Sequence, residues 1–166
     1  KKSKLKYRLS KNIFKETAAE LAKGKIIAWH QDRAEFGPRA LGNRSILTSP
    51  YPKDMKDFLN ARVKFREEFR PFAPAILNEY TEEYFEIQQE SPHMLINAKV
   101  RNEKAEEVSA AIHIDNTARV QTVKPVCIDS EFLAYEHVDQ RVVLAAVVVA
   151  AVFVVAVSTA IITVIN

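Results

Sequence analysis

Glycine, arginine and hydroxyl groups gather in one short stretch, GPRALGNRS at residues 37–45. The chain has only three glycines, and two of them, Gly37 and Gly42, lie in this stretch. Glycine lets the backbone approach a ligand closely, and an arginine fork matches the oxygens of a phosphate or carboxylate two at a time. The stretch therefore predicts an anion pocket in which Arg39 binds the ligand.

Basic residues continue beyond this loop. Between Arg33 and Arg70 there are nine Lys or Arg and five Asp or Glu, whereas residues 79–90 hold five Glu and no base. We expect Lys64 and Arg70 to bind an anion, and we interpret Lys53, Lys56, Arg62 and Arg66 as a solvated helix face. Arg70 lies in FRPFAP, residues 69–74, where we expect a rigid and partly dehydrated guanidinium, which is costly without an anion.

A third polar segment runs from His113 to Val123. If the segment is extended, alternation places Arg119, Gln121 and Val123 on one side of a strand. His113 and Asp115 are interpreted as a structural hydrogen-bonded pair. The sequence has neither the His and Cys spacings of a metal site nor a Walker-type phosphate loop. A bound nucleotide must therefore be held by dispersed Arg and Lys side chains.

Local signals predict an α/β domain around these segments. A helix is predicted from Asn12, which can cap it, to Gly24, which suits the left-handed position after its end. Lys25 to Trp29 then reads as a short buried strand, so the chain enters the domain by a helix, a turn and a strand.

The middle of the chain alternates between helical and extended patterns. A second helix is predicted over about residues 52–64, with Met55, Phe58, Leu59 and Val63 as its apolar stripe and the basic side chains away from that stripe. We expect extended chain at 72–77, a short exposed helix within 79–90 capped by Thr81, strands at 94–100 and 118–123, and a polar loop at 102–107.

The C-terminal segment from Val142 to Ile165 carries no charge and consists mostly of Val, Ala, Ile and Thr. Twenty-four uncharged residues could form a membrane anchor. They could equally form two buried strands, with a turn marked by Ser158, Thr159 and Thr163. A third interpretation is that the residue identities here are in error.

The bulk composition bounds the domain organisation. With 166 residues and a net charge of +3, we expect a basic linker at residues 1–11 and a single domain at 12–166. The single Cys127 and the lack of a secretory signal pattern favour the cytoplasm. The chain begins without Met, and we expect it to be a piece of a longer polypeptide.

Three blocks together carry a resemblance to a known family: EFGPRALGNRSIL at 35–47, NARVKFREEFRPFAP at 60–74 and TARVQTV at 117–123. In this order and spacing they resemble the C-terminal domain of the carbamoyltransferases that modify nodulation factors and aminoglycoside-type antibiotics. The similarity covers about Tyr7 to Val123. After Val123 we find nothing like the family's Asn-Thr-Ser-Phe-Asn motif.

The resemblance implies an α/β, YrdC-like fold, an open twisted mixed sheet with flanking helices. It implies that this domain makes carbamoyl adenylate from carbamoyl phosphate and ATP, with Mg²⁺, and that an N-terminal actin-like domain passes the carbamoyl group to a hydroxyl of a small-molecule or saccharide acceptor. By the same resemblance Arg39, Lys64 and Arg70 are catalytic, and Asn43, Ser45 and Arg119 complete the substrate and nucleotide site.

Two other functions compete with this interpretation. One is threonylcarbamoyl-adenylate synthesis for tRNA modification, although its Lys-Arg-x-x-x-Pro-type motif is missing from the sequence. The other is a non-catalytic basic module that binds RNA or single-stranded DNA. We expect no nucleic-acid partner, because Phe58, Phe65, Phe69 and Phe72 fit core positions better than exposed stacking platforms.

Overall fold

The computed structural model describes residues 8–124, 142–147 and 161–165. Its helices and helical turns are α1 (Ile13–Ala22), α2 (Met55–Leu59), the π-helix η1 (Asn60–Lys64), η2 (Asn78–Tyr80), α3 (Thr81–Tyr84), η3 (Asn102–Lys104) and η4 (Ser109–Ala111). Its strands are β1 (Ile26–His30), β2 (Arg44–Thr48), β3 (Ala73–Leu77), β4 (Phe85–Glu86), β5 (Ile96–Val100), β6 (Thr117–Val123), β7 (Val142–Val147) and β8 (Ile161–Ile165).

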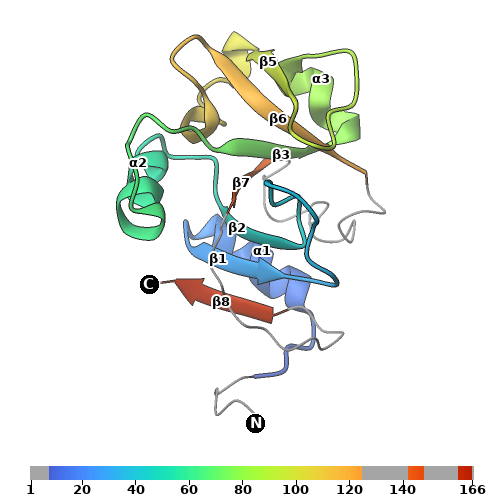
Figure 1. Cartoon of the computed structure of the whole chain (residues 1–166), viewed down its shortest axis with the longest axis vertical. Coiled ribbons are helices and arrows are strands. Elements are labelled where there is room, and N and C mark those ends of the chain that lie inside the picture. The colour runs from blue at the N-terminus through green and yellow to red at the C-terminus, as the bar shows by residue number, and fades with distance from the viewer. Residues whose placement is uncertain (1–7, 125–141, 148–160, 166) are drawn as a thin grey trace.

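The described strands form one mixed sheet in the order β4-β5-β6-β3-β7-β2-β1-β8 (Figure 1). The pair β3 and β6 is parallel, and the other pairs are antiparallel. Among the described strands, the edge strands β4 and β8 each pair on one side only, and helices flank the sheet. The predicted open, mixed α/β sheet with flanking helices is confirmed.

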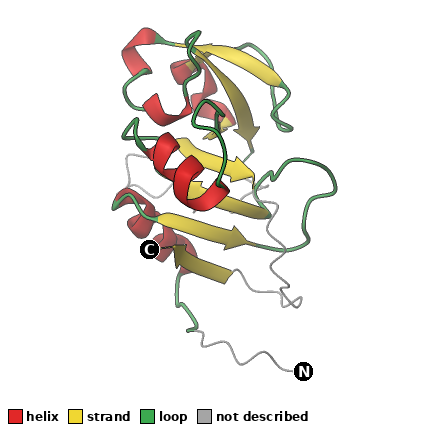
Figure 2. Ribbon diagram, turned by 60° about the vertical axis from the view of Figure 1, so that its left-hand side comes forward, coloured by secondary structure: helices red, strands yellow, loops and turns green. Residues whose placement is uncertain are grey.

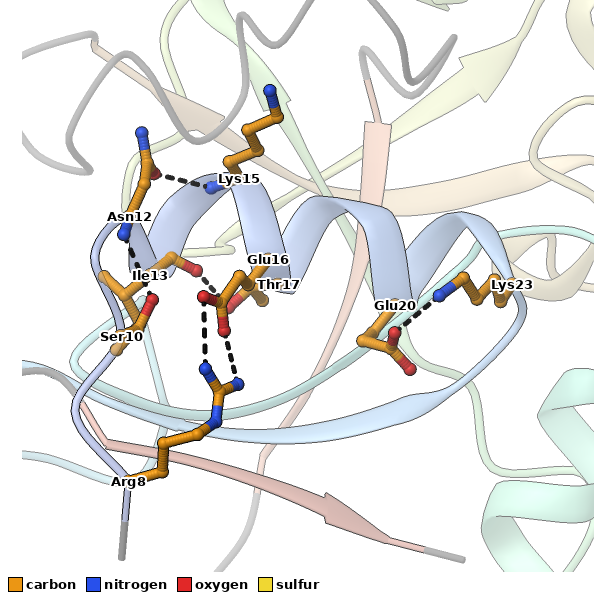
Figure 3. A network of polar contacts seen from close by, with 9 residues as sticks. All are labelled: Arg8, Ser10, Asn12, Ile13, Lys15, Glu16, Thr17, Glu20 and Lys23. Atoms are coloured by element: carbon orange, nitrogen blue, oxygen red, sulfur yellow. Dashed lines mark hydrogen bonds and ion pairs between the residues drawn. The ribbon is translucent and has the colours of Figure 1, made fainter.

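The first helix forms where its local signals predict it. Asn12 caps α1 by accepting a hydrogen bond from the Lys15 backbone N–H at 2.9 Å, and Gly24 adopts a left-handed φ of 73° after the helix ends. The Arg8 side chain forms an ion pair of 2.6 Å with Glu16 of α1 (Figure 3). The end of the predicted basic linker is thus attached to the helix, while residues 1–7 lie outside the described residues.

Alternation along the strands divides the core between the two faces of the sheet. Ile27 and Trp29 of β1 pack in the cluster that the α1 side chain Leu21 joins. Ile26, which points to the opposite face, packs with Leu59 of α2. Helix α2 and its continuation η1 therefore cover one face, and α1 covers the other (Figure 2).

The predicted helix at 52–64 forms only in part. After α2 the chain widens into the π-helix η1, which shifts the faces that an α-helical pattern would give. The polar Asn60 is fully buried, and Phe58, expected in the apolar stripe, is exposed. Leu59 is buried as expected, and Met55 and Val63 pack against its cluster.

The acidic segment at 79–90 is not an exposed helix. Helix α3 has only four residues, and Tyr84, Phe85 and Ile87 are buried in a cluster with β5 and β6. Thr81 is not the cap, because its hydroxyl donates to the Leu77 carbonyl. The prediction of an exposed helix was wrong because it rested on the five glutamates, whereas the aromatic residues between them are drawn into the core.

The apolar C-terminal segment supplies strands β7 and β8, which confirms the strand interpretation for these two ranges. Strand β7 lies between β3 and β2, and β8 pairs with β1. Thr163 is not in a turn, because it lies inside β8 opposite Ala28. Within the described part of the chain, none of the helices is long and apolar enough to cross a bilayer. Ser158 and Thr159 lie outside it, as does Cys127.

Candidate anion-binding site

Five cationic side chains form one electrostatic neighbourhood, which we call the cation cluster: Arg39, Lys64, Arg66, Arg70 and Arg119. Burial and repulsion by Arg39 lower the pKa of Arg119. Burial, then Arg70 and Arg119, lower the pKa of Arg66. The cluster therefore joins three separate segments: the loop between β1 and β2, the turn after η1, and strand β6.

Negative charge around the cluster is scarce. Arg70 pairs with Glu67 at 3.1 Å. Arg39, Lys64 and Arg119 make no ion pair with a carboxylate of residues 8–124. Lys64 and Arg119 are also half-buried. Half-buried cations that repel one another and lack counter-charges are costly, and a bound anion would remove that cost.

The loop that carries Arg39 folds around a single carboxylate. Glu35 Oε1 accepts hydrogen bonds from the backbone N–H groups of Leu41 and Asn43, each at 2.7 Å, and of Arg44 at 3.3 Å. Gly42 sits between these donors with a φ of 122°, which favours glycine. The loop shape is thus set by contacts within the protein.

Strand β6 holds the same loop from the other side. The Gln121 side-chain amide donates to the Leu41 carbonyl at 2.9 Å. Gln121 and Arg119 are two residues apart on β6 and so point to the same face. Strand β6, which supplies Arg119, therefore also holds Leu41, two residues after Arg39.

The buried amide of Asn60 organises the second segment. Its Nδ2 donates to the carbonyls of Glu68 at 3.2 Å and Arg70 at 3.0 Å, while its Oδ1 accepts from Arg66 Nε at 2.7 Å. The Arg66 guanidinium also lies 4.7 Å from the centre of the Phe72 ring. Residues 65–70 thus wrap around Asn60, which places Lys64, Arg66 and Arg70 on one turn.

A left-handed residue closes this turn. Phe65 follows η1 with a φ of 49°, a conformation that is uncommon for a bulky side chain. It reverses the chain between Lys64 and Arg66. Backbone outliers of this kind, like π-helical turns, are enriched at functional sites.

Two aromatic side chains of this turn contradict their predicted core positions. Phe65 is 83% exposed and Phe69 is 78% exposed, whereas Phe72 is buried as expected. Arg70 also differs from the expectation, because its side chain is 53% exposed and therefore not dehydrated. The prolines around Arg70 direct the chain into β3 without covering the guanidinium.

Asn43 and Ser45 already have partners inside the protein. The Asn43 amide donates to the Arg33 carbonyl at 2.7 Å, and Ser45 Oγ accepts from the Gly42 N–H at 3.2 Å. Both side chains hold the Arg39 loop in its shape. Their predicted hydrogen bonds to a ligand stay a prediction, as do the ligand contacts of Arg39, Lys64, Arg70 and Arg119.

The His113 segment begins as a turn, which contradicts the extended conformation expected there. Asn116 has a φ of 61°, and the strand starts only at Thr117. Thr117 Oγ1 donates to Asp115 at 2.7 Å and contacts His113 Nδ1 at 3.2 Å, so the His and the Asp meet through a threonine. Burial is the main cause that lowers the pKa of His113, which favours its neutral form.

Comparison with known proteins identifies the family of this chain. Residues 18–148 match the family described as the carbamoyltransferase C-terminus. The chain belongs to this family. The match continues past Val123, where the sequence motifs of the resemblance end, and it includes strand β7 of the sheet.

Several curated relatives resemble this carbamoyltransferase C-terminal domain over most of its length. Nodulation protein NolNO of Sinorhizobium fredii is 49% identical over 115 residues, which are 68% of this chain and 17% of that protein. An uncharacterised protein of Synechocystis is 41% identical over 139 residues, 72% of this chain and 23% of its own length.

A relative with an enzyme name is also similar. The 3'-hydroxymethylcephem-O-carbamoyltransferase of Streptomyces clavuligerus is 45% identical over 106 residues, 64% of this chain and 20% of that protein. The chain thus spans between 17% and 23% of the length of these relatives. The expected family is confirmed, and the activity of a whole carbamoyltransferase remains a matter for proposal.

Sequence reasoning missed four residues that shape this carbamoyltransferase domain: Glu35, Asn60, Arg66 and Gln121. Arg66 was interpreted as solvated, yet it lies in the middle of the cation cluster and is bonded to Asn60. The available signal was their position, because each stands inside one of the three family blocks. Polar residues without an evident ligand role in such blocks are candidates for shaping the backbone.

We expect anion binding to weaken as the pH rises through about 8. Burial first, and repulsion by Arg66 second, lower the pKa of Lys64 to about 8. Lys64 then loses its charge above that pH, whereas arginine keeps it. In calorimetric titrations with inorganic pyrophosphate at several pH values, Lys64→Arg should lose less affinity than the wild type over this rise.

The same shift predicts the pH dependence of stability. Between the lowered pKa of about 8 and the ordinary value of 10.5, the unfolded chain binds one more proton at Lys64 than the folded chain. The contribution of Lys64 to the free energy of unfolding therefore rises with pH in this window. A wild-type and Lys64→Arg pair with identical pH profiles of binding and stability would contradict the assignment.

Proposed function

We propose that this domain activates a carbamoyl group by forming carbamoyl adenylate from carbamoyl phosphate and ATP. The observation that carries the proposal is the cation cluster, in which Arg39, Lys64 and Arg119 lack carboxylate partners among the described residues. Membership in the carbamoyltransferase family supports a carbamoyl substrate, and the uncompensated positive charge fits two polyanionic substrates.

The balance of the reaction explains why cations suffice. A carbamate oxygen forms a bond to the α-phosphorus of ATP, and pyrophosphate leaves. The phosphate of carbamoyl phosphate is released as inorganic phosphate with the consumption of one water. Fixed guanidinium and ammonium donors hold the phosphates together and stabilise the developing charge. The reaction needs no nucleophile from the protein.

Roles for the individual residues follow from their positions. Arg39 and Arg119, from the loop and from β6, would bind one phosphate from two sides. Lys64, the last residue of η1, and Arg70, on the turn that follows, would neutralise the second anion. Mg²⁺ would accompany ATP on the phosphates. Among the described residues, no three His, Cys, Asp or Glu side chains form a group that could hold a metal ion.

Transfer of the activated group requires further protein. Because the chain spans about a fifth of its relatives' length, we propose that an N-terminal actin-like domain of the same polypeptide receives the carbamoyl adenylate. That domain would pass the carbamoyl group to a hydroxyl of a small molecule or saccharide. The relative named as an O-carbamoyltransferase supports an oxygen acceptor. A reaction that consumes ATP would take place in the cytoplasm.

The decisive assay is pyrophosphate release. The complete polypeptide with ATP and Mg²⁺ should release pyrophosphate when carbamoyl phosphate is added, and much less without it. Acetyl phosphate serves as the control substrate, because it carries the same acyl phosphate without the carbamoyl nitrogen. Folded protein that shows no release dependent on carbamoyl phosphate would rule out the proposed reaction.

The exposure of Phe65 and Phe69 favours one second candidate, the binding of single-stranded RNA. Exposed aromatic rings beside cations are typical of such sites. Filter binding to a short RNA at increasing salt separates the two candidates. Tight binding that falls steeply with salt would favour RNA, and weak binding together with pyrophosphate release would favour carbamoyl activation.

A further inference from the structure

We propose that Glu35 is a positioning residue for Arg39, whose loop it folds so that the guanidinium is held beside Arg119. The inference rests on the proposed function and assigns a role to a side chain of opposite charge to the cluster. The Glu35 side chain is only 9% exposed. Its Oε1 receives three backbone N–H groups, at Leu41, Asn43 and Arg44.

The Glu35 carboxylate compensates the partial positive charge of the N–H groups that converge in this loop. Three N–H groups that converge on one point form a nest that attracts anions. Here the anion is part of the protein, so the loop takes its shape before any ligand arrives. Oε2 of the same carboxylate lies 3.5 Å from Arg44 Nε. The negative charge of Glu35 is thus taken up locally and repels an incoming phosphate little.

The ionisation of Glu35 agrees with this role. Burial would raise its pKa, but the hydrogen bonds from Leu41, from its own backbone, from Asn43 and from Arg44 outweigh burial and lower the pKa below its usual value. The carboxylate therefore stays charged at neutral pH. Its bonds to the loop are charge-assisted, which makes them stronger than neutral ones.

Anchoring is needed because Arg39 and Arg119 repel each other. Without an anchor this repulsion would favour a loop displaced from β6. Glu35 holds the loop from within, and Gln121 holds it to β6 through the Leu41 carbonyl at 2.9 Å. Both anchors hold the backbone that follows Arg39, from Leu41 to Arg44, so loosening either one should release the guanidinium from Arg119.

A double-mutant cycle on the complete polypeptide tests this role, with binding of inorganic pyrophosphate measured by calorimetry. Glu35→Gln should weaken binding roughly tenfold. The same change in an Arg39→Ala background should cost almost nothing, because the residue that Glu35 positions is already gone. Glu16→Gln is the matched control, since it loses an ion pair on α1 that involves no residue of the cluster (Figure 3), and it should bind normally.

A second variant keeps the inference testable if Glu35→Gln unfolds. Gln121→Met removes the other anchor without changing charge, and it should weaken pyrophosphate binding in the wild type but not in the Arg39→Ala background. Equal losses in both backgrounds, for either variant, would overturn the positioning role. Wild-type protein that binds pyrophosphate but releases none from its substrates refutes the proposed function alone, and the cycle still decides the role of Glu35. Wild-type protein that does not bind pyrophosphate refutes both.

Discussion

Replacing Arg39 by alanine should lower the rate of pyrophosphate release at least roughly a hundredfold, with little change in thermal stability. Arg39 is a half-buried cation that lacks an ion pair within the described residues and faces Arg119. Its removal relieves repulsion in the folded protein and, in the proposed mechanism, takes away a donor to the transition state. Rates are measured with both substrates saturating, and melting is followed for the same samples.

A matched arginine provides the control for this result. Arg62 lies on η1 with its guanidinium 4.8 Å from the Phe58 ring centre, and it is exposed to solvent. Arg62→Ala should keep the wild-type rate within a factor of about two to three, the scale of a small surface effect. Equal losses for Arg39→Ala and Arg62→Ala would show that only total charge matters, and the specific site would be refuted.

Replacing Asn60 by alanine should destabilise the protein by about 2–4 kcal/mol. The change leaves the carbonyls of Glu68 and Arg70 without their donor, and Arg66 Nε without its acceptor, around a side chain that is itself fully buried. Urea denaturation curves provide the free energy of unfolding and its slope. Asn97→Ala, at an exposed position of β5, should change stability by less than about 0.5 kcal/mol.

Asn60→Asp sharpens this prediction. Aspartate can still accept from Arg66, but its carboxylate would face the two carbonyl oxygens that Asn60 serves as a donor. We expect a loss of stability at least as large as that of Asn60→Ala, because a buried charge then meets two acceptors. A mild effect of Asn60→Asp would mean that residues 65–70 keep their fold without these bonds.

Local signals sufficed for the elements that local forces build. The cap at Asn12 and the left-handed Gly24 act within a few residues, so α1 was predicted at its observed position. The widening of the second helix into η1 could not be predicted in this way. It depends on carbonyls at Glu68 and Arg70 that return to Asn60 from later in the chain.

In the candidate site, too, some residues could be predicted from the sequence and others depend on contacts that the sequence does not show. Arginine and lysine residues stand out in a sequence, and the resemblance pointed to Arg39, Lys64, Arg70 and Arg119. Glu35 did not stand out, because a carboxylate near an anion site looks unfavourable until its three N–H partners are known. Nor did the sequence show that Phe65 and Phe69 are exposed, because hydrophobicity alone favours the core.

Strand β7 has a consequence for the order in which the protein is made. It joins β3 to β2, so β2, which follows the Arg39 loop, and β3, which pairs with the Arg119 strand β6, are linked by backbone strand pairing only after residue 147 has been synthesised. On the ribosome all three basic segments emerge before the strand that aligns them. A chain that stops short of Val142 should therefore expose less well aligned arginines to cellular polyanions, and the nascent protein completes its binding site only after β7 has been made.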